Sequence, residues 1–325
     1  MSRVLRALTA IAGILTLSAG VPALASAPNY PERPIKIVIP YSAGGGTDQF
    51  MRIVAKRASE TLGQPITIIN KPGGSTVIGM KSVISAEPDG YTLLVSTNTS
   101  YTLIPYVMKP KPYSPEESLD YIGVVGETAM VITAHSSMPD TLAQVMANAK
   151  KDPGGYTYAT YGVGSSTHLA GEMFMNDTGV SFQHIPYKGV EAVAALAGGQ
   201  VNLMVDGVNA ASAMIKAGKT KPLVVLQHKR SEFLPDTPTL TEAGYPSVNA
   251  STISYVMSAP KGTPVPIINK LHAAFSEALR DPDVLKQISS VQTSPAYLGP
   301  EEAKRFVERQ SAAFIDLVKK KGIAF

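Results

Sequence analysis

Residues 40–48, with the sequence Pro-Tyr-Ser-Ala-Gly-Gly-Gly-Thr-Asp, have the composition of a loop that binds an anion. They directly follow the apolar run at 35–39, whose β-branched residues are typical of a buried strand. The glycines let the backbone turn and let a ligand approach it closely, while Thr47 and Asp48 are favoured at the start of a helix. Because the first N–H groups of a helix lack internal partners and attract negative charge, the loop predicts a pocket for an anionic small molecule.

The sequence of this loop argues against nucleotide binding. No Lys-Ser or Lys-Thr pair follows the glycines, as a Walker A motif requires. Gln49 stands where a G-x-G-x-x-G motif needs its third glycine. The alternative that stays open is an ordinary strand-to-helix turn without a ligand.

A second segment, Tyr-Gly-Val-Gly-Ser-Ser-Thr-His at 161–168, also follows a strand-like run and opens a helix-like one. Ser165, Ser166 and Thr167 provide hydroxyls at the cap, and two such helix starts facing each other would hold a carboxylate at either end. A catalytic alternative makes Ser165 or Ser166 a nucleophile with His168 as its base. It is disfavoured, because the G-x-S-x-G elbow is absent and a histidine on the same helical turn reaches the serine hydroxyl poorly.

Two further polar positions could face the same cleft. Asp206 ends the apolar run 201–205, at the carboxyl edge of an expected parallel strand, where ligands collect in open α/β sheets. It would also be the acid of the hydrolase alternative, or simply a helix cap. The hydroxyl-rich run 96–101, with Thr97 and Asn98, could line the cleft or form a solvated loop.

Alternating strand-like and helix-like segments must position these residues. The expected strands are 35–39, 66–69, 91–95, 156–160, 182–185, 201–205, 222–227 and 252–257, and the expected helices are 47–62, 76–85, 166–176, 189–197, 207–217, 264–280 and 300–320. Repeated βαβ units predict parallel sheets covered by helices. The restart of the pattern near 156 indicates two lobes with a binding cleft between them.

The N-terminus predicts export. Residues 1–27 have a basic start, an apolar stretch and small residues around Ala25 and Ala27, which is the form of a cleaved secretory signal. The chain has no cysteine and a formal charge of +4, without a long basic run. These features indicate a free periplasmic monomer and give no case for nucleic acid, and the dispersed histidines predict no metal and no cofactor.

Further short motifs lie along the chain in a fixed order. They are Tyr-Pro-Glu-Arg-Pro-Ile at 30–35, Asn-Lys-Pro-Gly-Gly at 70–74, Pro-Asp-Gly-Tyr-Thr-Leu-Leu at 88–94, Pro-Tyr-Lys-Gly at 186–189 and Pro-Asp-Thr-Pro-Thr-Leu at 235–240. Together with the two glycine-containing loops, they resemble the Bug family of TctC-like solute-binding receptors. The resemblance covers nearly all of the chain after residue 27.

The resemblance implies a two-lobed α/β fold of the type II periplasmic binding protein kind, each lobe a mainly parallel sheet flanked by helices. It implies a signal peptide at 1–27, a first lobe at 28–125 and 253–325, and a second lobe at 126–252. The segments that cross between the lobes are expected near 121–131 and 252–257. The ligand would lie in the cleft between the lobes.

The resemblance also implies a function and a site. Such a receptor is not an enzyme: it captures a small carboxylate through backbone amides, hydroxyls and waters, and delivers it to the permease subunits of a tripartite tricarboxylate transporter. A ligand-sensing partner of a membrane signalling protein is the alternative. The ligand-binding residues by position are Tyr41, Ser42, Ala43, Gly44, Gly45, Gly46, Thr47, Asp48, Ser75, Thr97, Asn98, Gly162, Ser165, Ser166, His168 and Asp206.

Two positions depart from the family pattern. Family members more often have Phe where Tyr41 stands and Ala-Gly where Ser75 and Thr76 stand. The added hydroxyls could extend hydrogen bonding to the ligand. The class of acid therefore stays open among aliphatic dicarboxylates, aromatic carboxylates and acidic amino acids.

Overall fold

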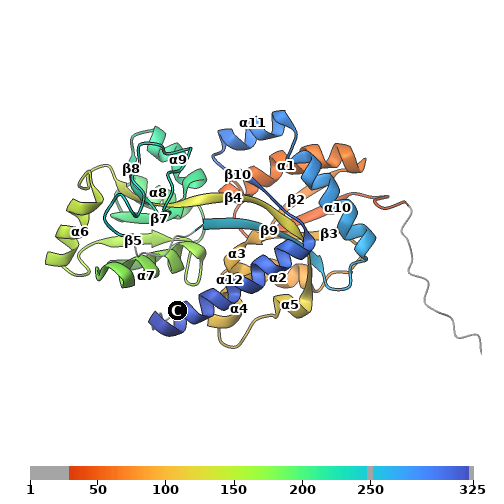
Figure 1. The fold of residues 1–325 in the computed structure, drawn as a ribbon, viewed down its shortest axis with the longest axis horizontal. Helices are drawn as coiled ribbons and strands as arrows, with labels where there is room; N and C mark the ends of the chain where they lie inside the picture. Colours follow the sequence, from red (N-terminus) through yellow and green to blue (C-terminus); the bar gives the residue numbers. More distant parts are fainter. Residues whose placement is uncertain (1–28, 247–251, 322–325) are drawn as a thin grey trace, which may run out of the picture.

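A computed structural model describes residues 29–246 and 252–321 (Figure 1). The expected signal peptide at 1–27 lies outside the described residues. Across the part that is described, none of the helices is both long and apolar enough to cross a bilayer.

The N-terminal part of the chain folds as predicted from its βαβ rhythm. Parallel strands pair in the order β2-β1-β3, with Ile37 of β1 opposite Ile68 of β2 and Leu93 of β3. These elements are β1 (Ile35–Ile39), α1 (Gly46–Leu62), β2 (Ile66–Asn70), α2 (Val77–Ile84) and β3 (Thr92–Thr97). Three short helices follow, α3 (Asn98–Thr102), α4 (Ile104–Val107) and α5 (Pro115–Ser118). We call the body around β1–β3 lobe 1.

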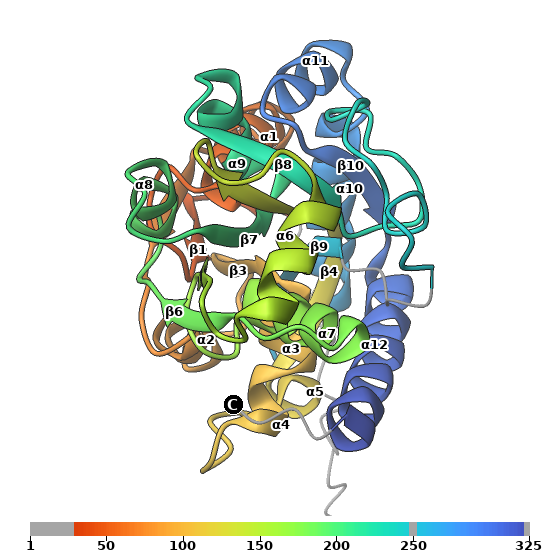
Figure 2. The same ribbon diagram turned by 90° about the vertical axis from the view of Figure 1, so that its left-hand side faces the viewer.

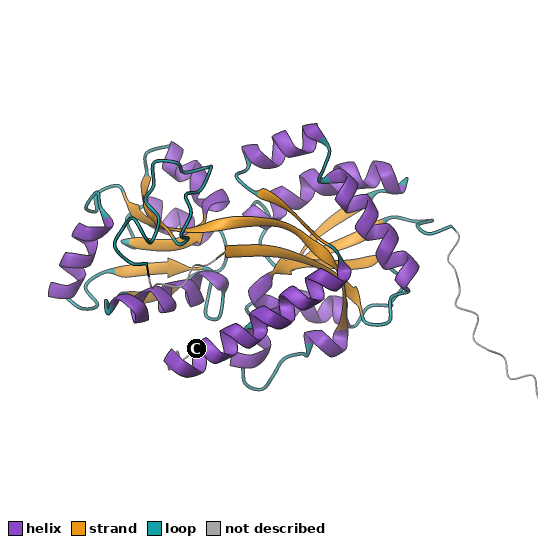
Figure 3. Cartoon of the chain, viewed as in Figure 1, coloured by secondary structure: helices purple, strands orange, loops and turns teal. Residues whose placement is uncertain are grey.

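A second parallel group forms lobe 2, on the left of Figure 1. Here β5 pairs with both β6 and β7 in parallel. Its elements are α6 (Leu142–Lys151), β5 (Thr157–Thr160), α7 (Ser166–Thr178), β6 (Gln183–Pro186), α8 (Glu191–Ala197), β7 (Leu203–Gly207), α9 (Val208–Lys216) and β8 (Thr220–Val225). In Figure 3 the strands of each lobe lie inside and the helices outside.

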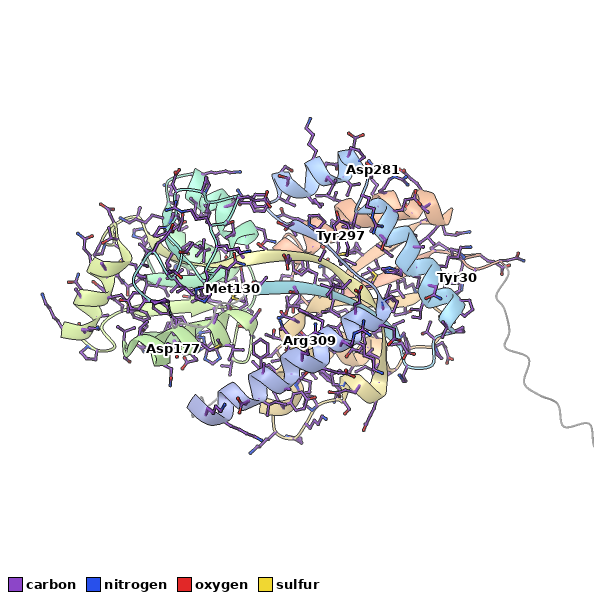
Figure 4. All side chains as sticks on the ribbon, viewed as in Figure 1. Tyr30, Met130, Asp177, Asp281, Tyr297 and Arg309 are labelled. Carbon is purple, nitrogen blue, oxygen red and sulfur yellow. The ribbon has the colours of Figure 1, made fainter. Side chains whose placement is uncertain are left out.

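Two long strands run between the lobes. These are β4 (Leu119–His135), whose first half pairs antiparallel with β9 (Thr252–Pro260) and whose second half pairs antiparallel with β7 and β8. Met130, labelled in Figure 4, lies on β4 opposite Gly207 of β7 and is 2% exposed. The ten described strands therefore join one mixed sheet. Eight follow the order β2-β1-β3-β9-β4-β7-β5-β6, and β8 and β10 (Ser294–Leu298) each pair with β4 off this path.

The C-terminal segment packs against lobe 1. It contains α10 (Val265–Ala278), α11 (Pro282–Ser290), β10 (Ser294–Leu298) and α12 (Pro300–Lys321). Arg57 of α1 donates to Asp281 before α11 and to Glu277 of α10, each at 2.9 Å, which fixes these helices side by side (Asp281 is labelled in Figure 4). The far end of α12 contributes Phe314 and Val318 to an apolar cluster with Leu169 and Met173 of α7.

The observed sheet differs from the predicted one around β4. The sheet is parallel within the two βαβ groups, but every pairing that involves β4 or β9 is antiparallel. The segments expected to cross between the lobes, 121–131 and 252–257, fall inside these strands. The expected lobe boundary at 125/126 falls near the middle of β4, where Gly126 leaves room for the Phe50 ring: a Cβ there would lie 2.5 Å from the ring.

Candidate functional site

The first loop ends in an open helix N-terminus. Gly44 has a left-handed backbone (φ +81°), Gly45 is the extended N-cap residue, and α1 begins at Gly46, one residue before the predicted start at Thr47. The N–H groups of Gly46, Thr47 and Asp48 have no hydrogen-bond partner among the described residues. These are the groups with which a helix start binds an anion.

The carboxylate of Asp48 holds this loop in shape. It accepts hydrogen bonds from the Gly44 N–H at 2.9 Å, from Arg52 Nε at 3.0 Å and from Asn70 Nδ2 at 3.1 Å. Burial alone would raise its pKa, but the bonds from Arg52, Gly44 and Asn70 together lower it. The side chain of Asp48 is therefore engaged by the protein, and only its backbone N–H is left for a ligand.

The phenol of Tyr41 ties the first loop to the end of β3. Its oxygen lies 2.8 Å from the Thr97 hydroxyl and 3.0 Å from the Ser96 hydroxyl, and it accepts the Thr97 N–H. Asn98 points elsewhere, donating to Gln310 of α12 at 2.8 Å. Thr97 thus lies next to the first loop, whereas the amide of Asn98 fixes α12.

The second loop ends in a capped helix start. The Ser165 hydroxyl accepts the N–H of His168 at 3.2 Å, and α7 begins at Ser166. The N–H groups of Ser166 and Thr167 have no partner within the described ranges. The Thr167 hydroxyl accepts the N–H of Tyr161 and so closes the loop on itself.

Histidines lie under the second loop. Nδ1 of His168 accepts the N–H of Gly164 at 3.1 Å, and its Nε2 lies 3.6 Å from Glu172 Oε1. The His184 ring stacks on His168 with centroids 4.0 Å apart, and burial followed by the nearness of His168 lowers the pKa of His184 to about 4. The hydrogen bond from His168 lowers the pKa of Glu172, with Tyr158 adding to the effect. His168 is thus built into the support of the loop.

This geometry does not form the serine–histidine pair of the hydrolase alternative. The hydroxyl of Ser165 receives the backbone N–H of His168 rather than its ring, and it lies 3.1 Å from the Thr167 hydroxyl. Both ring nitrogens of His168 already have partners other than a serine, namely Gly164 and Glu172. A general base must reach the proton that it removes.

The two lobes touch across the cleft at several points. Ser75 Oγ donates to the carbonyl of Val163 at 2.8 Å. Cβ atoms added to glycines would collide with the opposite lobe: one on Gly46 would lie 2.2 Å from Asn209 Nδ2, and one on Gly189 would lie 2.5 Å from Ser42 Oγ. The structure is therefore a closed form, seen from the lobe 2 end in Figure 2. Beside the Ser75–Val163 contact lies a groove of about 620 Å³, lined by residues of both lobes.

A polar cluster links the first loop, the second loop and the end of β7. Asn209 of α9 donates to the Tyr255 hydroxyl at 2.7 Å, and the Thr47 hydroxyl lies beside the same phenol. Tyr161 lies close to both Asp206 and Tyr255. Asp206 is 1% exposed, and burial raises its pKa to about 7, although Tyr161 and the Gly207 N–H oppose this.

Comparison with known proteins identifies the architecture. The profile of the tripartite tricarboxylate transporter family receptor, TctC, matches residues 50–323. The chain belongs to the TctC family. Protein BugT of Bordetella pertussis is 33% identical over 318 residues, which cover 97% of each chain.

Solved structures of TctC-like proteins agree with this fold. The periplasmic binding protein BugD is 34% identical with a TM-score of 0.85, over 91% of this chain and 99% of that one. Rpa4515 of R. palustris, solved with adipate, is 30% identical with a TM-score of 0.87, over the same shares. The resemblance to Bug receptors and the two-lobed α/β fold expected from the sequence are confirmed.

In this TctC chain the predicted site residues fall into three groups. Contacts or close approaches around the cleft involve Ser42, Gly46, Thr47, Ser75 and Asp206. Side chains engaged with the protein belong to Tyr41, Asp48, Thr97, Asn98, Ser165 and His168. The remaining residues, Ala43, Gly44, Gly45, Gly162 and Ser166, lie in the two loops or at the start of α7. Asn209, Tyr255 and Thr293, whose hydroxyl accepts from Asn209 Nδ2 at 3.2 Å, were not predicted. Only Asn209 carries a signal, because it stands at a helix start after a strand, as Thr47 and Thr167 do.

Proposed function

We propose that this protein is a receptor that captures a small carboxylate between its lobes and delivers it to the permease of a tripartite tricarboxylate transporter. The observation that carries the proposal is the pair of helix starts, at Gly46 and Ser166, with N–H groups that lack partners among the described residues. They come from different lobes of a closed cleft. Backbone N–H groups at helix starts bind carboxylates without the need for a cationic side chain.

The proposed ligand class is a dicarboxylate, an aromatic carboxylate or an acidic amino acid. The presence of adipate in the structure of the related Rpa4515 supports a small acid. The residues proposed to contact it are the predicted set, with the backbone of the loop at 41–48 and of the loop at 162–168 as its centre. Closure around the ligand would present the permease with a surface that differs from that of the open receptor.

The same proposal places the protein in the periplasm as a monomer without enzymatic activity. The three-part segment at 1–27 supports export through a cleaved signal. The engaged ring of His168, whose described partners are Gly164 and Glu172 rather than a serine, supports binding rather than hydrolysis.

Thermal stability in the presence of carboxylates tests the proposal. A ligand that binds only the folded protein raises the melting temperature, because it adds RT ln(1 + [L]/Kd) to the free energy of unfolding. We expect at least one acid of a panel of C4–C8 dicarboxylates, benzoates and acidic amino acids to raise it, and calorimetry to give one site per chain. If no acid does so, and the purified protein carries none by mass spectrometry, the proposal is overturned.

Two variants at one position separate charge from shape. Gly44→Asp places a carboxylate beside the helix start, where an added Cβ meets nothing within 4 Å. Gly44→Asn has the same shape and the same left-handed backbone (φ +81°) without the charge. Binding should be lost with aspartate and largely kept with asparagine.

A further inference from the structure

The carboxyl group of Asp206 has one oxygen that the fold uses and one that it does not. Oδ1 accepts the N–H of Gly207 at 2.7 Å, which closes the turn between β7 and α9. Oδ2 is buried and has no hydrogen-bond partner among the described residues. The phenol of Tyr161 lies beside the carboxyl and lowers its pKa by hydrogen bonding, yet it is not placed to satisfy Oδ2, which has no donor in bonding geometry among the described residues. A buried acceptor without a donor is costly, so an unfilled Oδ2 calls for an explanation.

Asp206 lies close to both helix starts, where the ligand is proposed to bind. Tyr161, its neighbour, precedes the second helix start and is also close to Tyr255. The Tyr255 hydroxyl contacts Asn209 and lies beside Thr47 of the first helix start. Asp206 is therefore next to the place where the two anion-binding loops converge. The helix starts there offer donors, and Asp206 offers the complementary acceptor.

We propose that Asp206 Oδ2 accepts a hydrogen bond from a donor group on the bound acid, so that the ligand is an amino or hydroxy carboxylate rather than an unsubstituted one. This inference rests on the proposed function and deepens it. The helix starts would take the carboxylate oxygens, while the ammonium or hydroxyl group would meet Asp206.

The turn between β7 and α9 needs only Oδ1 of Asp206, because Oδ1 alone accepts the Gly207 N–H. The substitution Asp206→Asn keeps the shape of the side chain and an oxygen for the Gly207 N–H, so the contact that the fold uses is retained. In place of Oδ2 the variant would present an NH2 group, which donates and cannot accept. An ammonium group, which has no acceptor, would then face a donor.

The groups around Asp206 allow ammonium and hydroxyl ligands to be told apart. The neighbours that act on its titration are the phenol of Tyr161 and the N–H of Gly207, and no charged side chain of the described residues is among them. With a pKa of about 7, part of the Asp206 population carries a proton at neutral pH. An ammonium ligand would expel that proton, whereas a neutral hydroxyl would not require its release.

The test compares matched acids on four proteins. Succinate, malate and aspartate, and then glutarate, 2-hydroxyglutarate and glutamate, are titrated by calorimetry into the wild type, Asp206→Asn, Asp206→Ala and the control Asp236→Asn, whose side chain is exposed. Each titration is repeated at pH 7 in two buffers of different ionisation enthalpy. We expect the wild type and the control to bind a substituted acid about tenfold to a hundredfold more tightly than its parent, as for a hydrogen bond to a charged group.

Asp206→Asn should remove the preference for the amino acids, measured within each protein as the ratio of the affinities for the substituted and the parent acid. A ligand hydroxyl can still accept from the Asn NH2 group, so a preference for the hydroxy acids should be lost only in Asp206→Ala. Proton release that accompanies an amino acid, and is absent in Asp206→Asn, would assign the ammonium class; preference without release would assign the hydroxy class. If the parent acids bind as tightly as the substituted ones, or if a folded Asp206→Ala keeps the preference, this inference fails and the receptor function stands. If none of a wider panel of carboxylates binds to the wild type, both fail.

Discussion

Ser75 and Thr76 hold a backbone conformation that suits glycine. Their φ angles are +49° and +79°, and Ser75 donates from this conformation to the opposite lobe. A left-handed backbone costs about 1–2 kcal/mol per non-glycine residue, and a β-branched side chain is the least tolerant. The strain lies at a contact between lobes, where residues with unusual φ angles often serve a function.

Replacing Thr76 with glycine should therefore stabilise the protein. We expect Thr76→Gly to raise the free energy of unfolding by about 1 kcal/mol, because relief of strain exceeds the added entropy of the unfolded chain. Urea denaturation followed by circular dichroism measures the change. Ser82→Gly, within α2, is the matched control and should lower stability by up to about 1 kcal/mol. If Thr76→Gly lowers the free energy of unfolding, the backbone at Thr76 is not strained by the amount expected.

The buried carboxyl of Asp206 predicts a pH dependence of stability without ligand. Its pKa is raised from 3.8 to about 7 in the folded protein, so between these values the folded state binds more protons than the unfolded state. The contribution to stability is therefore present at low pH and is lost as pH rises through about 7. Asp206→Asn abolishes this dependence, so the variant should gain about 2–4 kcal/mol relative to the wild type between pH 4.5 and pH 8.

Equilibrium unfolding at the two pH values checks this, with Asp236→Asn as the exposed control. A difference between variant and wild type that stays constant across this range would show that Asp206 is ionised throughout. The quantity compared is the change with pH in the difference between the unfolding free energies of variant and wild type, so the stability of the variant at a single pH is not used.

At the scale of elements, the start of α7 depends on one side chain. Ser165 caps the helix, and loss of such a cap costs about 1 kcal/mol. Ser165→Ala should lower the free energy of unfolding by this amount, while Ser165→Asn and Ser165→Asp should keep it, since both side chains are good caps. Thermal or urea unfolding measures the series.

The carboxylate affinities of the same Ser165 variants should follow a different order from their stabilities. Ser165→Asp puts a negative charge beside the free N–H groups of Ser166 and Thr167 and should abolish carboxylate binding in a folded protein. Ser165→Asn should retain most of it. Equal affinities for the aspartate and asparagine variants would show that the second helix start does not face the ligand.

The sequence predicts elements well where a signal is local. The strands β1, β2 and β3 and helix α1 follow from apolar runs, glycines and caps, and they were predicted within two residues. The helices α3, α4, α5, α6 and α11 and the strand β10 were not predicted. The length of β4 also escaped prediction, because its two halves pair with different partners, and pairing between distant segments is not visible in a single stretch of chain.

The same limit applies to the site. Glycines and hydroxyls marked both loops, since a helix start needs them wherever it lies. The role of Asp48 could not be predicted, because it depends on hydrogen bonds from Arg52 and Asn70. The contact between Asn209 and Tyr255 forms only when the two lobes pack together. The residue types therefore predicted which groups could bind a ligand, but tertiary contacts determine which of these groups are already hydrogen-bonded within the protein.

At the scale of the whole molecule, closure brings Ser42 and Gly189 together. A Cβ on Gly189 would lie 3.1 Å from that of Ser42, near the separation of about 3.8 Å in disulfides. The chain has no other cysteine to compete. In the double variant Ser42→Cys/Gly189→Cys, oxidation should therefore lock the lobes shut and slow exchange of a bound carboxylate by orders of magnitude, with recovery on reduction.

Thiol titration and stopped-flow kinetics with an acid that binds the wild type measure this, and the two single variants are the controls. Fast exchange in a fully oxidised double variant would mean that the ligand enters without separation of the lobes at this edge. Cysteine at position 189 would take a left-handed backbone (φ +83°), so unfolding of both single variants is measured first. If both are folded, failure of the thiols to pair would mean that the closed form is rarely visited.

The shared strands β4 and β9 set a rule for recombining this receptor with its relatives. Each half of β4 is an inner strand of a different lobe, so a lobe excised at 125/126 would lose a partner for β9 or for β7. A chimaera that takes one lobe from another receptor must therefore also carry the matching half of each crossing strand. Specificity in such proteins should be easier to exchange through the loops after β1, β5 and β7 than through whole lobes.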